Sequence, residues 1–237
     1  MSEFKIGIIV ADVDEYVPLA KRIESGEYEE YSYLSRKGHK FEVSTQNGKA
    51  TVISVLCGIG KVNAAVIASH FKTIGCDMIL NYGLSGGISG IKKGELTIAT
   101  EFVEHDFDLS GIGYKLCEKP GQRYIYKSDD RLNSLMDKIL KGAKKGIAVS
   151  GDSFICDETI KSSMKENFNA MSCDMETAAI AYVCDFGNIP FLSLRQVSDD
   201  AGDDAASSYK DVIDNSQIVL SDIIFDFIKV VIDSYEE

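Results

Sequence analysis

The stretch "FKIGIIVADVDEYVPLAKRIE", Phe4–Glu24, sets the architecture that the rest of the chain follows. It begins with a nearly continuous β-branched run, which is typical of a strand buried on both faces of a sheet. Acidic residues come next, and from Asp14 onward apolar residues recur at helical spacing. A buried strand that leads straight into a helix predicts an α/β protein.

The same alternation continues along the chain. Strands are expected at 29–36, 40–46, 49–57, 77–83, 94–106, 144–155 and 189–198, and helices at 60–75, 130–142 and 208–237. The strand at 77–83 is expected to stop at the glycine cluster "GLSGGISG". No linker or repeat interrupts the pattern. We therefore expect residues 1–237 to form a single three-layer α/β/α domain with a central mixed β-sheet.

Composition narrows the possible partners. The net charge of −12 argues against a nucleic-acid partner or an anionic membrane surface, because both need clustered Lys and Arg. No apolar run approaches the roughly 20 residues of a membrane span. The six cysteines form no CxxC pair, and no basic leader precedes the first strand, which favours reduced thiols in a cytoplasmic protein. We expect no metal and no other cofactor.

The segment "SCDMETAAIAYVC", Ser172–Cys184, raises a question of charge. It is apolar on all sides from Met175 onward, as a buried helix would be, yet Asp174 and Glu176 stand at its start with no Lys or Arg nearby in sequence. Either the helix dipole favours them there, or they meet a ligand. Dipole capping suffices for Asp174.

Two further acids fall at the ends of expected strands. Glu15 follows the first strand, where the helix dipole also suits an acid, and Asp199 ends the last buried strand. Together with Glu176 they place three carboxylates at the carboxyl edge of the sheet, where ligands bind in such folds. His105 is more readily explained as a packed structural histidine than as a catalytic one.

Glycine-rich segments give weaker signals. "CGIGKV" at 57–62 lacks the first glycine and the hydroxyl residue of a phosphate-binding loop, and "YGLSGGISG" at 82–90 lacks the spacing of a dinucleotide site. Both are consistent with turns and with close approach of the backbone to a ligand.

The sequence resembles the methylthioadenosine/S-adenosylhomocysteine nucleosidases, which belong to the nucleoside phosphorylase superfamily. The resemblance rests on "KIGIIVADVDE", "CGIGKVNAA", "NYGLSGG", "EHDFD", "VSGDSFI", "CDMETAAIAYVC" and "LRQVSD", which occur in the family's order and spacing over almost the whole chain. The pair "DMETAAIA" and "RQVSD" is the most specific. The resemblance implies a hydrolase that splits the purine–ribose bond of 5′-substituted adenosines with water and frees adenine.

It also implies roles for the acids. Glu15 matches the carboxylate that orients and deprotonates the attacking water. Asp199 matches the general acid that protonates adenine, Ser198 the hydroxyl that orients this acid, and Arg195 an arginine near it.

Other positions match the substrate-binding residues of the family. Glu176 matches the residue that binds the ribose hydroxyls, and Met175 the side chain packed against the sugar. Phe154 and Ile155 match the segment that stacks on the base and meets it through backbone groups.

Three positions depart from the family pattern. Val10 stands where a glycine is usual, Asp12 where an apolar residue is usual, and Leu84 where a small hydroxyl residue is usual. The resemblance also implies which residues line the pocket for the 5′ substituent. They are Asp12, Ile59, Leu109, Ile112 and Tyr209, the last as the aromatic residue of a closing lid. An acid there suggests a preference for a polar or cationic 5′ substituent.

Two alternatives stay open. One is a purine nucleoside phosphorylase, although no arginine lies within "NYGLSGG" or "GIIVADVDE" to hold phosphate. The other is a nucleoside-binding protein without turnover. The resemblance further implies a homodimer whose partner helps to close the 5′ pocket near Ile112 and Tyr114.

Overall fold

The computed structural model describes residues 4–202 and 205–234, except for the side chains of 206–218. Its strands are β1 Lys5–Val10, β2 Glu29–Tyr33, β3 Arg36–Ser44, β4 Lys49–Leu56, β5 Met78–Gly87, β6 Leu96–Glu104, β7 Ile125–Lys127, β8 Lys144–Ser150, β9 Ala170–Asp174 and β10 Phe191–Asp199. Its helices are α1 Val13–Glu24, α2 Lys61–Thr73, the short η1 Ser110–Ile112, α3 Asp130–Ile139, α4 Glu158–Phe168, α5 Thr177–Gly187 and α6 Ala205–Ser234. Within these described residues, none of the helices has the length and hydropathy that a membrane crossing needs.

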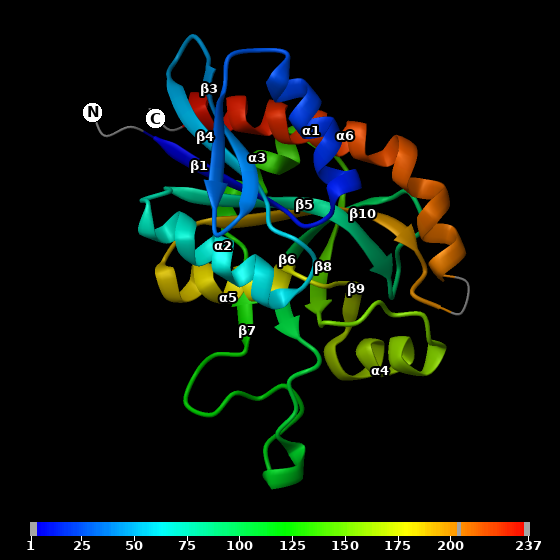
Figure 1. Ribbon diagram of the computed structural model, residues 1–237. Helices are drawn as coiled ribbons and strands as arrows, with labels where there is room; N and C mark the ends of the chain where they lie inside the picture. The colour runs from blue at the N-terminus through cyan, green and yellow to red at the C-terminus, as the bar shows by residue number, and fades with distance from the viewer. Residues whose placement is uncertain (1–3, 203–204, 235–237) are drawn as a thin grey trace.

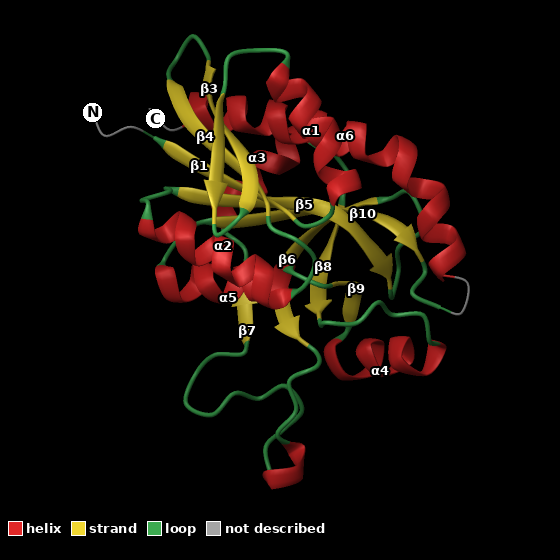
Figure 2. Cartoon of the chain, viewed as in Figure 1, coloured by secondary structure: helices red, strands yellow, loops and turns green. Residues whose placement is uncertain are grey.

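The described strands form one mixed sheet in the order β10-β6-β8-β9-β5-β1-β4-β3-β2, with β7 paired to β6 (Figure 2). Strand β5 also pairs with β10, so β5, β10, β6, β8 and β9 close into a ring. Parallel pairing of β1, β5 and β10 brings the carboxyl ends of these strands to one edge. The predicted central mixed β-sheet of an α/β protein is confirmed.

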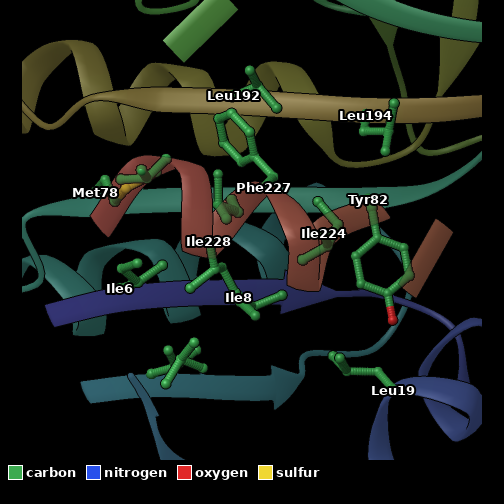
Figure 3. Close-up of a cluster of buried hydrophobic side chains, with 14 of the residues drawn as sticks. Ile6, Ile8, Leu19, Met78, Tyr82, Leu192, Leu194, Ile224, Phe227 and Ile228 are labelled. Atoms are coloured by element: carbon green, nitrogen blue, oxygen red, sulfur yellow. The ribbon is translucent and has the colours of Figure 1, made fainter. Parts of the chain in front are cut away.

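Helices cover both faces of the sheet (Figure 1). Successive side chains of β1 point to opposite faces of the sheet, as in any pleated strand. Ile6 and Ile8 pack with α1, α3 and α6 on one face, and Ile9 packs with α2 and α5 on the other. Figure 3 shows Phe227 and Ile228 of α6 against the first face. The continuous apolar run at the start of the chain therefore corresponds to a strand that is buried on both faces.

The first part of the glycine cluster, residues 83–87, lies inside a strand, whereas the sequence predicted that the strand would stop there. Strand β5 runs on to Gly87. A side chain at Gly83 would overlap the guanidinium of Arg195 and the carboxylate of Glu15, and one at Gly86 would lie 2.9 Å from the sulfur of Cys173. These glycines act as strand residues that allow close approach of neighbouring groups.

The segment Ser172–Cys184 divides between two elements. Residues up to Asp174 belong to β9, which pairs with β8 and β5, and the helix α5 begins only at Thr177. Helix α4, which Asp157 caps through its side chain, was not predicted. It has only one buried residue, Met164, so its apolar periodicity is weak.

A methyl group added at Gly7 is expected to destabilise the fold. In β1 it would overlap the ring of the fully buried Phe71, so Gly7→Ala should lower the unfolding free energy by about 1–3 kcal/mol in urea titrations. Gly26→Ala is the matched control, because the nearest atom to its added methyl lies at 3.7 Å; it should stay within about 0.5 kcal/mol of the parent. Equal effects of the two substitutions would contradict this packing.

Candidate active site

A cavity of about 480 Å³ opens at the carboxyl edge of β1, β5, β9 and β10. Its volume is in the range of small-molecule sites. Its walls are Ala11, Asp12, Glu15, Ile59, Leu84, Ser85, Gly86, Phe154, Cys173, Asp174, Met175, Glu176, Arg195, Ser198 and Asp199. The three carboxylates that the sequence singled out, Glu15, Glu176 and Asp199, thus line one hollow.

Arg195 explains why acids enter the interior near Asp174. This fully buried guanidinium lies in β10, with its Nε 3.4 Å from Asp174 Oδ2 and its Nη2 3.7 Å from Glu176 Oε2. Nη1 donates to the carbonyl of Leu84 at 3.2 Å, and Nη2 donates to Asn81 Oδ1 at 2.8 Å. The counter-ion comes from β10, which is separated from β9 by β5, and it lies 19 or more residues away in sequence.

Asp174 has a structural role that goes beyond a dipole interaction. Its Oδ1 accepts the backbone N–H groups of Glu176 and Thr177, both at 3.0 Å, and the hydroxyl of Ser150 at 2.6 Å. Its Oδ2 accepts the Thr177 hydroxyl. The expected capping is therefore present, and the ion pair with Arg195 adds to it.

Glu176 is held at the helix start and faces the cavity. It is the N-cap of α5, and its Oε1 accepts the backbone N–H of Gly60 at 2.9 Å. Burial raises the pKa of Glu176, while the nearby Arg195 charge lowers it and Asp174 raises it. The glycine turn before α2 therefore supplies a backbone donor to a carboxylate of the site.

Glu15 is buried, as are the other two carboxylates. Its Oε1 accepts the Leu84 N–H at 2.7 Å, and Tyr82 donates its hydroxyl to the Glu15 carbonyl at 3.1 Å. Burial raises the pKa of this carboxyl, and Arg195 opposes the rise. Leu84 itself lines the cavity, so an apolar group borders the carboxylate where the family has a hydroxyl.

Asp199 is the last residue of β10 and pairs with Gly86 of β5, whereas Glu15 binds the backbone of the same strand at Leu84. Asp199 Oδ2 lies 2.6 Å from the Ser198 hydroxyl, and Asp199 Oδ1 accepts the Ala201 N–H at 2.8 Å. The Ser198 hydroxyl can instead donate to the Ser85 carbonyl at 3.2 Å, so its contact with Asp199 persists whether or not Asp199 carries a proton. Burial raises the pKa of Asp199.

The remaining predicted residues divide into three groups. Phe154, Met175, Ile59 and Asp12 line the cavity, and Ile155 borders a small adjoining hollow that shares its wall. Leu109 is not part of this wall. The Tyr209 side chain lies outside the described residues, although its backbone belongs to α6.

Asp12 caps a helix as well as lining the cavity. Its Oδ1 accepts the Asp14 N–H at 2.7 Å, which makes it the N-cap of α1. Val10 is fully buried in the core.

Sequence reasoning missed the position of Arg195. It placed Arg195 near Asp199, but the guanidinium contacts the other carboxylates and makes no hydrogen bond to Asp199 among the described residues. It also found no arginine around "NYGLSGG", whereas Arg195 packs directly against Gly83 there. The only signal was an arginine inside an otherwise apolar strand, which requires a buried partner.

His105 lies away from this cavity. A side chain at Gly151 would overlap its ring, and burial lowers the pKa of His105. Among the described residues, no group of three or more His, Cys, Asp or Glu side chains is placed to hold a metal ion.

Comparison with known proteins gives a consistent answer. Residues 5–229 match the phosphorylase superfamily. The chain is 34% identical over 231 residues to the 5′-methylthioadenosine/S-adenosylhomocysteine nucleosidase of Staphylococcus carnosus, covering 94% of this chain and 99% of the other. It is 31% identical over 218 residues to the aminodeoxyfutalosine nucleosidase of Campylobacter jejuni, with coverages of 90% and 93%.

The fold agrees with these matches. The crystal structure of the Helicobacter pylori methylthioadenosine/S-adenosylhomocysteine nucleosidase superposes with a TM-score of 0.90 at 27% identity, over 97% of this chain and 99% of the other. The predicted hydrolytic nucleosidase is thereby confirmed. The chain belongs to the methylthioadenosine/S-adenosylhomocysteine nucleosidase family of the phosphorylase superfamily, and it cleaves 5′-substituted adenosines to release adenine.

Proposed function

We propose that Asp199 protonates the departing adenine, Glu176 binds the ribose hydroxyls and Glu15 deprotonates the attacking water. The observation that carries this assignment is that these three carboxylates line one cavity, with Asp199 at one end and Glu15 and Glu176 beside Arg195. Adenine would then lie between Asp199 and Phe154, with Met175 against the sugar.

The chemistry requires both acid and anion. The glycosidic bond breaks through a state with oxocarbenium character, so a carboxylate at the ribose stabilises the developing positive charge. Adenine leaves well only when it gains a proton, which calls for a carboxyl that holds one near neutral pH. Burial of Asp199 favours its protonated form, and Ser198 fixes its orientation.

Glu15 has a proton-transfer role that depends on the transition state. Burial raises its pKa to about 8, with Arg195 lowering it and Glu176 raising it further. In the ligand-free protein at pH 7 this carboxyl is therefore largely protonated. The positive charge that develops on the ribose favours the carboxylate form, so Glu15 becomes a base when water attacks.

Arg195 acts through the carboxylates. Its guanidinium holds Glu176 and Asp174 in place and donates to the Leu84 carbonyl, next to the N–H that binds Glu15. The charge of Arg195 is shared by Asp174 and Glu176, and these carboxylates disfavour a phosphate dianion beside them, which supports water as the acceptor.

The wider setting is part of the proposal. We infer that residues 1–237 work as one nucleoside phosphorylase-like domain. We also infer that the protein works in the cytoplasm, because its six cysteines are all free thiols. We also infer a homodimer. Several large apolar side chains are exposed, as an interface would require: Ile59, Val62, Ile112, Tyr114 and Phe154, of which Ile59 and Phe154 line the cavity.

Asp199→Asn should abolish most adenine release. Loss of the proton donor is expected to lower kcat by about 10²–10⁴-fold, measured as free adenine from methylthioadenosine in phosphate-free buffer. Asp137→Asn is the matched control, since the Asp137 side chain is half exposed, pairs with Lys145 and does not line the cavity; its activity should match the parent. A requirement for phosphate, or an active Asp199→Asn variant, would contradict the assignment.

Glu15→Gln should change how stability depends on pH. Because the folded-state pKa of about 8 exceeds the ordinary value of 4.5, Glu15 lowers the unfolding free energy progressively as pH rises from 4.5 to 8. The variant lacks this loss, so its advantage over the parent should grow from pH 5 to pH 8, to at least about 1 kcal/mol in urea titrations.

The exposed Glu27→Gln serves as the control for that experiment, and its pH dependence should follow the parent. If Glu15→Gln follows the parent as well, the raised pKa of Glu15 is wrong.

A further inference from the structure

A second cavity of about 460 Å³ adjoins the first and shares Ala11, Asp12 and Ile59 with it. Its other walls are Val13, Ser35, Arg36, Lys37, Leu56 and Gly58. Asp199 and Ser198 line only the first cavity. On the proposed function, which this inference assumes, the base sits at Asp199, so the second cavity continues from the 5′ end of the ribose.

This second cavity carries charges of both signs. The Asp12 carboxylate uses Oδ1 to cap α1, and Oδ2 has no hydrogen-bond partner among the described residues. Arg36 donates from Nη2 to the neutral Asn63 Oδ1 at 2.6 Å. Neither Arg36 nor Lys37 forms an ion pair within the described part of the chain. Each charge is therefore available to a ligand that enters.

The arginine is held in place. Arg36 is the first residue of β3, after a two-residue turn in which Leu34 and Ser35 both have left-handed φ angles, of 44° and 63°. Such a conformation is costly for residues other than glycine and is found where a tight hairpin is needed. On the other side, a side chain at Gly58 would lie 3.0 Å from Arg36 Nη1, so the backbone packs closely on the guanidinium.

We propose that the second cavity binds the charged end of the 5′ substituent and that it selects a group bearing both an ammonium and a carboxylate. The α-amino-acid end of S-adenosylhomocysteine has this chemistry. The Asp12 carboxylate accepts the ammonium, and the planar guanidinium of Arg36, assisted by Lys37, binds the carboxylate. Ile59, which is half exposed at the junction, contacts the sulfur and methylene groups.

This arrangement discriminates against a methylthio group. A methylthio group ends before the second cavity and leaves Asp12 without a cation, whereas the homocysteinyl group satisfies both charges. The cavity thereby sets substrate preference by charge pairing at a distance from the reacting bond, without altering the catalytic carboxylates.

Four nucleosides test the proposal on the purified full-length protein, with free adenine as the readout. They are S-adenosylhomocysteine, 5′-S-(3-aminopropyl)-5′-thioadenosine, which lacks the carboxylate, 5′-S-(3-carboxypropyl)-5′-thioadenosine, which lacks the ammonium, and methylthioadenosine. S-adenosylhomocysteine should have the highest kcat/KM, about 10-fold or more above each singly charged analogue, as expected when a charged hydrogen-bonding partner is removed.

Two variants should each abolish the preference for S-adenosylhomocysteine over one of the singly charged analogues. Arg36→Met should bring the ratio of S-adenosylhomocysteine to the aminopropyl compound close to one. Asp12→Asn, which keeps an N-cap for α1, should do the same for the ratio to the carboxypropyl compound. Lys40→Met is the matched control, because Lys40 lies on the same strand, pairs with Glu29 and does not line the second cavity; it should keep both ratios.

The results distinguish failure of this proposal from failure of the proposed function. Parent ratios near one, or ratios that Arg36→Met and Asp12→Asn leave unchanged, overturn the proposal while the nucleosidase assignment stands. A carboxypropyl compound that equals S-adenosylhomocysteine also overturns it, in favour of an anion-only pocket. Absence of adenine from all four compounds would instead contradict the proposed function. The parent ratios decide the question even if a variant fails to fold.

Discussion

The buried guanidinium of Arg195 is the interaction on which the site depends. Charges are expensive in a protein interior, and three carboxylates within one cavity wall would repel one another. Arg195 lies between Asp174 and Glu176 and also lowers the pKa of Glu15. Nη1 donates to the Leu84 carbonyl and Nη2 to Asn81, while Nε faces Asp174 as an ion pair without a hydrogen bond. The arginine thus makes an acidic pocket compatible with a folded core.

One guanidinium does not neutralise three carboxylates. Asp174, Glu176 and Glu15 carry more negative charge than Arg195 offsets, and burial raises the pKa of both glutamates. The pocket therefore retains a proton near neutral pH when it is empty. This property suits a reaction in which positive charge appears on the sugar, because the carboxylate form is favoured only when that charge develops.

The two ends of the ligand space have different physical tasks. At Asp199 a buried carboxyl with a hydroxyl neighbour favours proton donation, and the backbone groups around it are fixed by β5 and β10. At Asp12 the space widens toward the β2–β3 hairpin, where the charges are more exposed and come from Arg36 and Lys37. Chemistry at one end and selection at the other can therefore vary independently, since they use separate elements of the sheet.

The sequence by itself determined the alternation of buried strands and helices, because a strand covered on both faces must be apolar throughout, as at Ile6–Val10. It also placed Glu15, Glu176 and Asp199 at one edge of the sheet, since ligands of such folds bind at the carboxyl ends of the strands. Only the tertiary structure decided what those acids contact. Arg195 reaches Asp174 because the pairing of β5 with β10 closes the ring of β5, β10, β6, β8 and β9, and Arg36 reaches the cavity through a hairpin. Both placements depend on pairing between strands, which local periodicity does not encode.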